Sequence, residues 1–116
     1  MITQNTRPLA LTQGDPRGVG LEITLKAFRA REAAKLPPFA ALGDPSLFAD
    51  AAAALAFDAA IEEATLETAT EIFARALPVV PLKRNRTGAA ATIASIEFAV
   101  EAVAQGRARA VVTNPI

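Results

Sequence analysis

The stretch that decides the fold reads LALTQGDPRGVG and runs from Leu9 to Gly20. It begins in a short apolar run, Pro8 to Thr12, which is typical of a buried strand. Residues 13–16 (QGDP) form a turn signal, and residues 21–35 (LEITLKAFRAREAAK) repeat their apolar positions with the period of an amphipathic helix. The stretch therefore predicts a strand that enters a glycine-rich turn and leaves as a helix.

The same unit occurs a second time. Phe39 to Leu42 is another short apolar run, and Gly43-Asp44-Pro45-Ser46 follows it. Asp44 is a suitable N-cap with Pro45 at the first helical position, so Leu47 to Phe57 is predicted to be a helix. Two strand-to-helix units in succession predict a parallel α/β sheet.

The middle of the chain is less regular. Residues 62–76 fit either a helix or a strand with loops, because β-branched residues alternate with helix formers. The prolines at positions 78 and 81 frame Val79-Val80, which we expect to be an edge-like strand or an extended loop.

The last third predicts a long helix followed by a strand. In the helix, Thr87 to Gln105, the apolar residues Ile93, Ile96, Val100 and Val103 form one face, and Gly106 is a natural C-cap. Ala108 to Thr113 then reads as a buried strand. Because that strand is followed by so little sequence, the fold looks interrupted, and we expect the chain alone to fold poorly or to self-associate.

Composition excludes several classes of function. The chain has 116 residues, with 12 Lys+Arg against 12 Asp+Glu, 52% hydrophobic residues, and no His or Cys. It is therefore neither disordered nor charged like a nucleic-acid-binding protein. Disulfides and zinc–thiolate sites are excluded, and the commonest general base is missing. No stretch has the length of a membrane span or the pattern of a secretory signal, so we expect a cytoplasmic protein.

Charge is unevenly distributed along the chain. Seven acidic residues and no basic residue lie between Asp44 and Glu71, and Lys83, Arg84 and Arg86 then follow in a cluster. Two interpretations stay open: solvated acidic and basic surfaces, or a phosphate contact from the basic cluster.

The glycine turn is the candidate site. Glycines let the backbone approach a ligand closely, and the amides of a helix N-terminus favour an anion. The turn matches neither G-x-G-x-x-G nor the P-loop pattern, and no acidic ribose ligand follows about 20 residues later. The pattern alone leaves a structural turn and a ligand-binding turn both open.

Three segments together resemble the 4-hydroxythreonine-4-phosphate dehydrogenase family of vitamin B6 biosynthesis. They are GDPRGVG (14–20), GAAATIASIEFAVEAVAQG (88–106) and the final VVTNPI (111–116). The residues that match are Gly14, Asp15, Pro16, Gly18 and Gly20 in the first motif, and Val112, Thr113, Pro115 and Ile116 in the last. The resemblance covers the whole chain but only about the first third of a family member. It implies that residues 1–116 are the N-terminal α/β portion of a longer two-domain dehydrogenase.

The resemblance also implies a fold and an activity. The fold is a three-layer α/β/α, isocitrate/isopropylmalate-dehydrogenase-like architecture with a mostly parallel sheet, in a homodimer. The activity is oxidation of 4-hydroxythreonine 4-phosphate with NAD or NADP, followed by decarboxylation to 3-amino-2-oxopropyl phosphate. A divalent metal (Zn, Mg or Co) is held by histidines outside this chain, so no catalytic or metal residue is assigned here.

Site residues carried over by the resemblance are few. Gly14, Asp15, Gly18 and Gly20 are implied to lie near the dinucleotide, and Thr113 is a candidate for substrate binding. Arg17 stands where the family usually has a small residue, which implies an added phosphate contact or a surface salt bridge. No residue 117 exists to supply the lysine that follows the family's last motif.

Other functions remain open. A related dehydrogenase acting on another four-carbon acid phosphate, such as threonate or erythronate phosphate, would share the motifs. A self-contained, non-catalytic α/β binding or assembly module would fit the balanced charge and the missing His and Cys. An isopropylmalate-type dehydrogenase fits less well, since that family has Gly where Pro16 stands.

Overall fold

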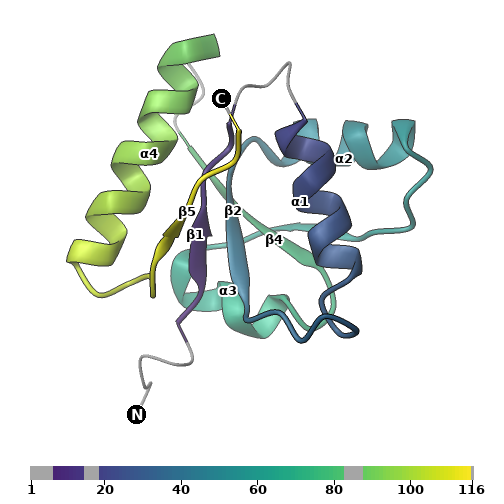
Figure 1. Ribbon diagram of the computed structural model, residues 1–116, viewed down its shortest axis with the longest axis horizontal. Helices are drawn as coiled ribbons and strands as arrows, with labels where there is room; N and C mark the ends of the chain where they lie inside the picture. The colour runs from purple at the N-terminus through teal and green to yellow at the C-terminus, as the bar shows by residue number, and fades with distance from the viewer. Residues whose placement is uncertain (1–6, 15–18, 83–87, 116) are drawn as a thin grey trace.

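A computed structural model describes residues 7–14, 19–82 and 88–115. These residues form a five-stranded, all-parallel sheet and four helices, as Figure 1 shows. In chain order the elements are β1 (Leu9–Leu11), α1 (Gly20–Arg29), β2 (Phe39–Gly43), α2 (Pro45–Ala54), β3 (Ile61–Glu63), α3 (Leu66–Ile72), β4 (Leu77–Pro81), α4 (Gly88–Ala104) and β5 (Val111–Val112). The strand order is β3-β4-β2-β1-β5. The predicted parallel α/β sheet is confirmed.

Helices cover both faces of the sheet. Helices α1 and α2 pack on the face that carries Leu11, Ala41 and Val79, and α3 and α4 pack on the face that carries Ala10 and Ala40. The steps from β1 to β2 to β3 cross the sheet in one direction, and those from β3 to β4 to β5 return. Parallel crossovers keep one hand, so reversing the direction moves the connecting helix to the other face. This arrangement is compatible with a three-layer α/β/α fold.

The first two helices begin as the sequence predicts, but both end earlier: α2 ends at Ala54, not at Phe57. Asp44 caps α2 through its Oδ1, which accepts a hydrogen bond from the Ser46 backbone N–H at 2.9 Å, and Pro45 is the first helical residue. Helix α1 ends at Arg29, not at Lys35. The residues between them form turns, and Lys35 has a positive φ of 54°.

The ambiguous middle segment contains both a strand and a helix. Strand β3 precedes α3, and Thr65 caps α3 in a capping box with Thr68. The Thr65 hydroxyl accepts from the Thr68 backbone N–H, and the Thr68 hydroxyl accepts from the Thr65 backbone N–H. Each hydroxyl thus satisfies one amide that the helix itself cannot.

The expectation of an edge-like strand or a loop at Val79-Val80 is wrong. Strand β4 lies inside the sheet between β3 and β2, and Val79 is fully buried. The two prolines are tolerated because Pro78 is the second residue of the strand and Pro81 is its last. At the ends of a strand the missing N–H removes little of the ladder.

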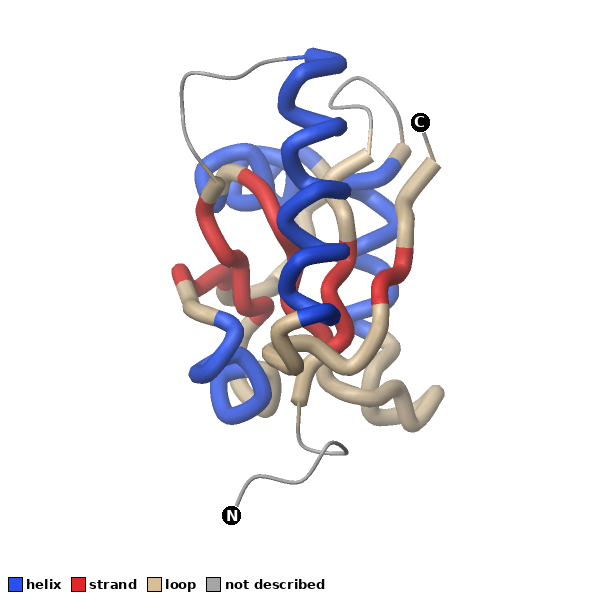
Figure 2. Tube along the Cα trace, turned by 90° about the vertical axis from the view of Figure 1, so that its left-hand side faces the viewer, coloured by secondary structure: helices blue, strands red, loops and turns tan. Residues whose placement is uncertain are grey.

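Helix α4 packs on the sheet mainly through small residues, and of the predicted apolar face Val103 packs against the core. The residues buried against the sheet are small: Thr92, Ser95, Ala99 and Ala102. Ile93 and Val100 are instead 55% and 56% exposed. Figure 2 views the molecule from this side and shows no other described element in front of α4. Small side chains lie on the inner face because they let the helix approach the sheet closely. Two of them, Thr92 and Ser95, form hydrogen bonds there.

The final strand is also less buried than expected. Strand β5 contains only Val111 and Val112, lies at the edge of the sheet and pairs with β1 alone. Val111 packs on the α4 face, whereas Val112 is 42% exposed. Self-association of the chain would depend on the exposed apolar side chains of α4 and β5. The expected self-association stays a prediction.

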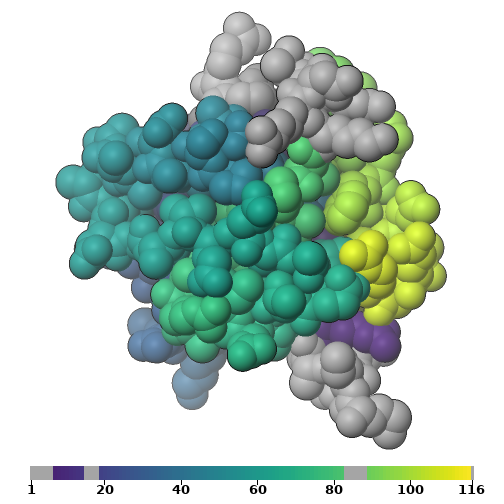
Figure 3. All heavy atoms as spheres, turned by 180° about the vertical axis from the view of Figure 1, so that it is seen from behind, coloured from purple at the N-terminus to yellow at the C-terminus, as the bar shows by residue number. Residues whose placement is uncertain are grey.

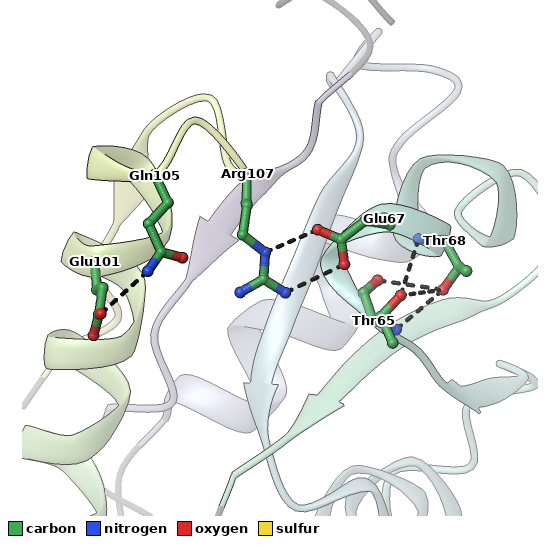
Figure 4. A network of polar contacts seen from close by, with 6 residues as sticks. All are labelled: Thr65, Glu67, Thr68, Glu101, Gln105 and Arg107. Carbon is green, nitrogen blue, oxygen red and sulfur yellow. Dashed lines mark hydrogen bonds and ion pairs between the residues drawn. The ribbon is translucent and has the colours of Figure 1, made fainter.

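Charged residues make surface ion pairs at the end of the sheet opposite the turns. One links the segment after α4 to α3: Arg107 Nε donates to Glu67 Oε2 at 2.8 Å, and Arg107 Nη2 donates to Glu67 Oε1 at 3.2 Å (Figure 4). Figure 3 shows the yellow segment after α4 lying against the teal residues of α3. Another joins Arg75 to Glu62. The basic cluster Lys83, Arg84 and Arg86 lies outside the described residues.

Replacing Glu67 by glutamine is expected to lower the free energy of unfolding by about 0.5 kcal/mol at pH 7, as for other exposed pairs. The hydrogen bond from Arg107 lowers the pKa of Glu67 below its ordinary value of 4.5. A lowered folded-state pKa adds stability above the unfolded-state pKa, and this is lost as the pH falls through the folded-state value. The difference between wild type and E67Q should therefore shrink as the pH falls below 4.5 and through the lowered folded-state pKa of Glu67. Urea unfolding at several pH values measures it, with E71Q on the same exposed face of α3 as the control. An E67Q deficit that persists in acid would contradict the assignment.

No helix in the described parts of the chain is long and apolar enough to cross a membrane.

Candidate functional site

The candidate site lies at the carboxyl edge of the sheet. Here β1 continues into Thr12-Gln13-Gly14, β2 ends at Gly43 and Asp44, and β5 continues into residues 113–115. Figure 1 shows the beginnings of α1 and α4 at the same end. In open α/β sheets ligands bind at this edge. The final motif meets the glycine turn there: Asn114 bonds to Thr12, which lies 102 residues earlier in the sequence.

A polar network fills this edge. The buried polar side chains among the described residues all belong to it: Thr12, Gln13, Thr24, Thr92, Ser95 and Asn114. Burying a polar group is costly unless it is hydrogen-bonded. A buried network whose members are hydrogen-bonded makes this edge of the sheet rigid.

Asn114 is the centre of the network. Its side-chain Nδ2 donates to the Thr12 carbonyl oxygen at 2.8 Å and to Thr24 Oγ1 at 3.0 Å. Its backbone N–H donates to Thr12 Oγ1 at 3.2 Å. The Thr24 hydroxyl in turn donates to the Gly20 carbonyl oxygen at 2.8 Å. A single side chain thus joins the last motif to the strand and the helix on either side of the glycine turn.

Helix α4 holds the same turn from the other face of the sheet. Thr92 Oγ1 donates to the Gly14 carbonyl oxygen at 2.8 Å, and the Gln13 backbone N–H donates to Ser95 Oγ at 3.4 Å. The Ser95 hydroxyl donates to the Thr92 carbonyl oxygen at 2.8 Å. The second segment of the resemblance, residues 88–106, therefore contacts the first directly.

Gly14 and Gly20 are glycines because another part of the chain occupies the space of a side chain. Gly14 has a φ of 76°, and a Cβ there would lie 2.7 Å from the Pro115 carbonyl oxygen and 2.9 Å from Asn114 Cβ. A Cβ on Gly20 would lie 2.8 Å from the Gln13 carbonyl oxygen. Contacts this short are not found in real proteins, so both positions exclude other residues. At both glycines the close approach is between two segments of the chain. These contacts therefore agree with the first of the two alternatives, a structural turn.

The predicted site residues divide into three groups. Gly14 and Gly20 lie at the site, whereas Asp15 and Gly18, like the neighbouring Arg17, lie outside the described residues. Thr113 is exposed and precedes Asn114. It borders an apolar hollow of about 270 Å³ between α1 and β5. Nothing in these contacts assigns Thr113 a ligand.

Several residues at the site escaped the sequence analysis. Val19 is the N-cap of α1, yet it makes no side-chain cap and is 54% exposed. An apolar residue at a position that favours Ser, Thr, Asp or Asn is a signal that could have been read from the sequence. The roles of Gln13, Thr92 and Asn114 had no such signal, because they depend on contacts between distant segments.

The site can bind but carries little reactive chemistry. Apart from Asp44, its described side chains are uncharged, and α1 offers the amides of its first turn, which have no partner within the helix. Among the described residues no group of three or more Asp or Glu side chains could hold a metal ion. The arrangement suits recognition of a ligand by backbone amides and neutral side chains.

Known proteins resemble this chain over nearly its full length, although no family model matches it. It is 42% identical to a 4-hydroxythreonine-4-phosphate dehydrogenase of Methylorubrum populi, over 99% of this chain and 36% of that protein. Proteins of the same name from Bradyrhizobium diazoefficiens and Zymomonas mobilis are 38% and 36% identical, over 100% and 95% of this chain and 39% and 34% of their own lengths. The chain thus spans little more than a third of these relatives, and over almost all of its own residues it is similar to proteins named 4-hydroxythreonine-4-phosphate dehydrogenase.

Proposed function

We propose that residues 1–116 are the N-terminal α/β portion of a two-domain, NAD(P)-dependent 4-hydroxythreonine-4-phosphate dehydrogenase with an isocitrate/isopropylmalate-dehydrogenase-like fold. The whole enzyme would oxidise the substrate alcohol, and decarboxylation would then give 3-amino-2-oxopropyl phosphate for vitamin B6 biosynthesis. It would act in the cytoplasm as a homodimer. The observation that carries the proposal is the meeting of the glycine turn and the final motif through Asn114 at the carboxyl edge.

The part of this chain in the reaction is to bind and orient the dinucleotide. The first-turn amides of α1 can donate to a pyrophosphate, because a helix N-terminus favours an anion. Val19 adds an exposed apolar surface beside them, on which a base or nicotinamide ring can pack. Asp15 and Gly18 remain predicted contacts of the same turn, and Thr113 a predicted substrate contact. The bound NAD(P) would accept the hydride from the substrate.

A divalent metal would have its ligands in the remainder of the enzyme. The described residues of this chain do not fit a metal, so its own contribution is the rigid edge that carries the turn. The network from Thr92 to Asn114 fixes the backbone at Gly14 from both faces of the sheet. Fixing the turn before the ligand arrives reduces the entropy lost on binding.

A chimera tests the proposal. Residues 1–116 would replace the matching region of the Methylorubrum populi relative, and NADH formation would be followed with 4-hydroxythreonine 4-phosphate. We expect activity that depends on substrate and metal, whereas the 116-residue chain alone should show no turnover. A folded chimera that oxidises only threonate or erythronate phosphate would favour the related dehydrogenases. A folded chimera without any activity, or full turnover by the chain alone, would overturn the proposal.

A further inference from the structure

We propose that a helix from the rest of the intact enzyme docks its apolar face beside α1, in the hollow between α1 and β5. This inference rests on the proposed function, because it takes residues 1–116 as one portion of a longer dehydrogenase. It adds to that function the surface through which this portion joins the remainder of the same enzyme chain.

The hollow follows β1 on the face of the sheet that carries α1, and its volume is about 270 Å³. Strand β1 contributes Leu9 and Leu11 to the lining, α1 contributes Ile23 and Ala27, and β5 contributes Val112. None of the residues that line the hollow is charged. A charged ligand would lose its hydration there without compensation, so the hollow suits apolar side chains.

The helical layer on this face does not extend over β5. Val111 packs on the face of α4, and the side chain of the next residue points to the opposite face of the sheet. There Val112 is 42% exposed, and Ile23 of α1 is also 42% exposed. Helices α1 and α4 lie on opposite sides of β1 and β5 (Figure 1). All-parallel sheets occur with both faces covered by helices, so the position beside α1 suits a further helix.

The side of α1 that faces the hollow has the form of a helix-packing surface. Ile23 and Ala27 are four residues apart, so their side chains form a ridge along α1. Such ridges pack into the groove of a neighbouring helix at an interaxial distance of about 8–10 Å. The short side chain of Ala27 allows this close approach. A helix therefore fits the hollow better than an irregular segment does.

The rest of the enzyme can supply this helix. The match with the Methylorubrum populi relative covers 36% of that protein, so more than half of it lies outside the match. Thr113 and Pro115 also line the hollow. In a longer enzyme, the residues that follow the final motif would therefore begin at the rim of the hollow.

A second copy of the chain fits the hollow less well. Across a twofold axis it would present the same hollow, and two hollows cannot fill each other. The exposed apolar side chains of α4, Ile93 and Val100, lie on the other face of the sheet. Packing α4 of one copy into the hollow of the next would give a head-to-tail contact, which does not close into a dimer. A helix from the same enzyme chain has neither difficulty.

A single thiol in the hollow tests the inference, because residues 1–116 contain no cysteine. The rate of alkylation of Ile23→Cys by iodoacetamide would be compared between the 116-residue chain and the chimera described above, with any other cysteine of the chimera replaced by serine. We expect alkylation at least about tenfold slower in the chimera, since a covered thiol reacts only when the structure opens. Val112→Cys, on the opposite side of the hollow, should show the same protection. Asp50→Cys, at an exposed position of α2, should react equally fast in both proteins.

Crosslinking identifies what covers the hollow. A benzophenone attached to the thiol of I23C should crosslink, within one chain, to a peptide from the part of the chimera that the relative contributes. Equal alkylation rates of I23C and V112C in the 116-residue chain and in a chimera that unfolds cooperatively would overturn the inference. A crosslink between two chains, or protection of the 116-residue chain that rises with its own concentration, would assign the hollow to a second copy and also overturn it. An active chimera with a reactive thiol would leave the proposed function standing, whereas a folded, inactive chimera with a protected thiol would overturn the proposed function alone.

Discussion

Replacing Gly14 by alanine is expected to lower the free energy of unfolding by about 3 kcal/mol. A positive φ costs a non-glycine residue about 1–2 kcal/mol. The added methyl group would also lie 2.7 Å from the Pro115 carbonyl oxygen and 2.9 Å from Asn114 Cβ. Neither can move without breaking the network that joins the two motifs, so overpacking adds a further 1–3 kcal/mol or so. Urea unfolding followed by circular dichroism measures the loss.

Gly106→Ala is the matched control, because Gly106 also has a positive φ of 73°. A Cβ there would meet only the flexible end of Arg7, at 3.1 Å. We expect a loss of about 1 kcal/mol, which reports the backbone term alone. Equal losses in the two variants would show that the turn and the final motif are not in close contact.

Replacing Asn114 by alanine is expected to cost about 2–3 kcal/mol. The substitution removes the donor to the Thr12 carbonyl oxygen and the donor to Thr24 Oγ1, both in a buried setting. Most of the lost free energy comes from the Thr12 carbonyl oxygen, which no longer accepts a hydrogen bond from residue 114. A buried acceptor without a partner loses its solvation without compensation. The backbone bond from residue 114 to Thr12 Oγ1 remains, so the strand pairing should survive.

Thr113→Ala provides the comparison for Asn114. Thr113 is the adjacent residue, but it is exposed, and its replacement should change stability by less than about 0.5 kcal/mol. Thermal unfolding of both variants would measure the difference. Similar stability of N114A and T113A would mean that the Asn114 amide does not hold the edge together.

Local signals predicted much of the fold because each depends on neighbouring residues. Asp44 and Pro45 predicted the start of α2 and the strand before it, since a cap and the helix that it begins are adjacent in sequence. The glycine turn likewise predicted β1 and α1. Strand β4 was misplaced because the two prolines suggest an edge, while its neighbours in the sheet come from other parts of the chain.

Helix α4 shows where periodicity alone fails. Its apolar residues occur on more than one face, and the face predicted from the sequence includes Ile93 and Val100, which are exposed. The side of α4 with Thr92, Ser95 and Ala99 packs on the sheet instead. There Thr92 and Ser95 bond to the Gly14 carbonyl oxygen and the Gln13 backbone N–H. Gly14 and Thr92 are 78 residues apart in the sequence, so no local pattern predicts this contact.

By itself, the sequence determined the first two strand-to-helix units, the parallel sheet and the glycine turn between β1 and α1. These follow from short-range patterns of apolar residues, caps and backbone preference. Only the tertiary structure decided what the turn contacts. Packing brought Asn114 and Pro115 against Gly14, made both glycines of the turn necessary, and set Gln13 beside Gly43. The physical reason is that close approach and hydrogen bonding between distant segments depend on where the sheet places them.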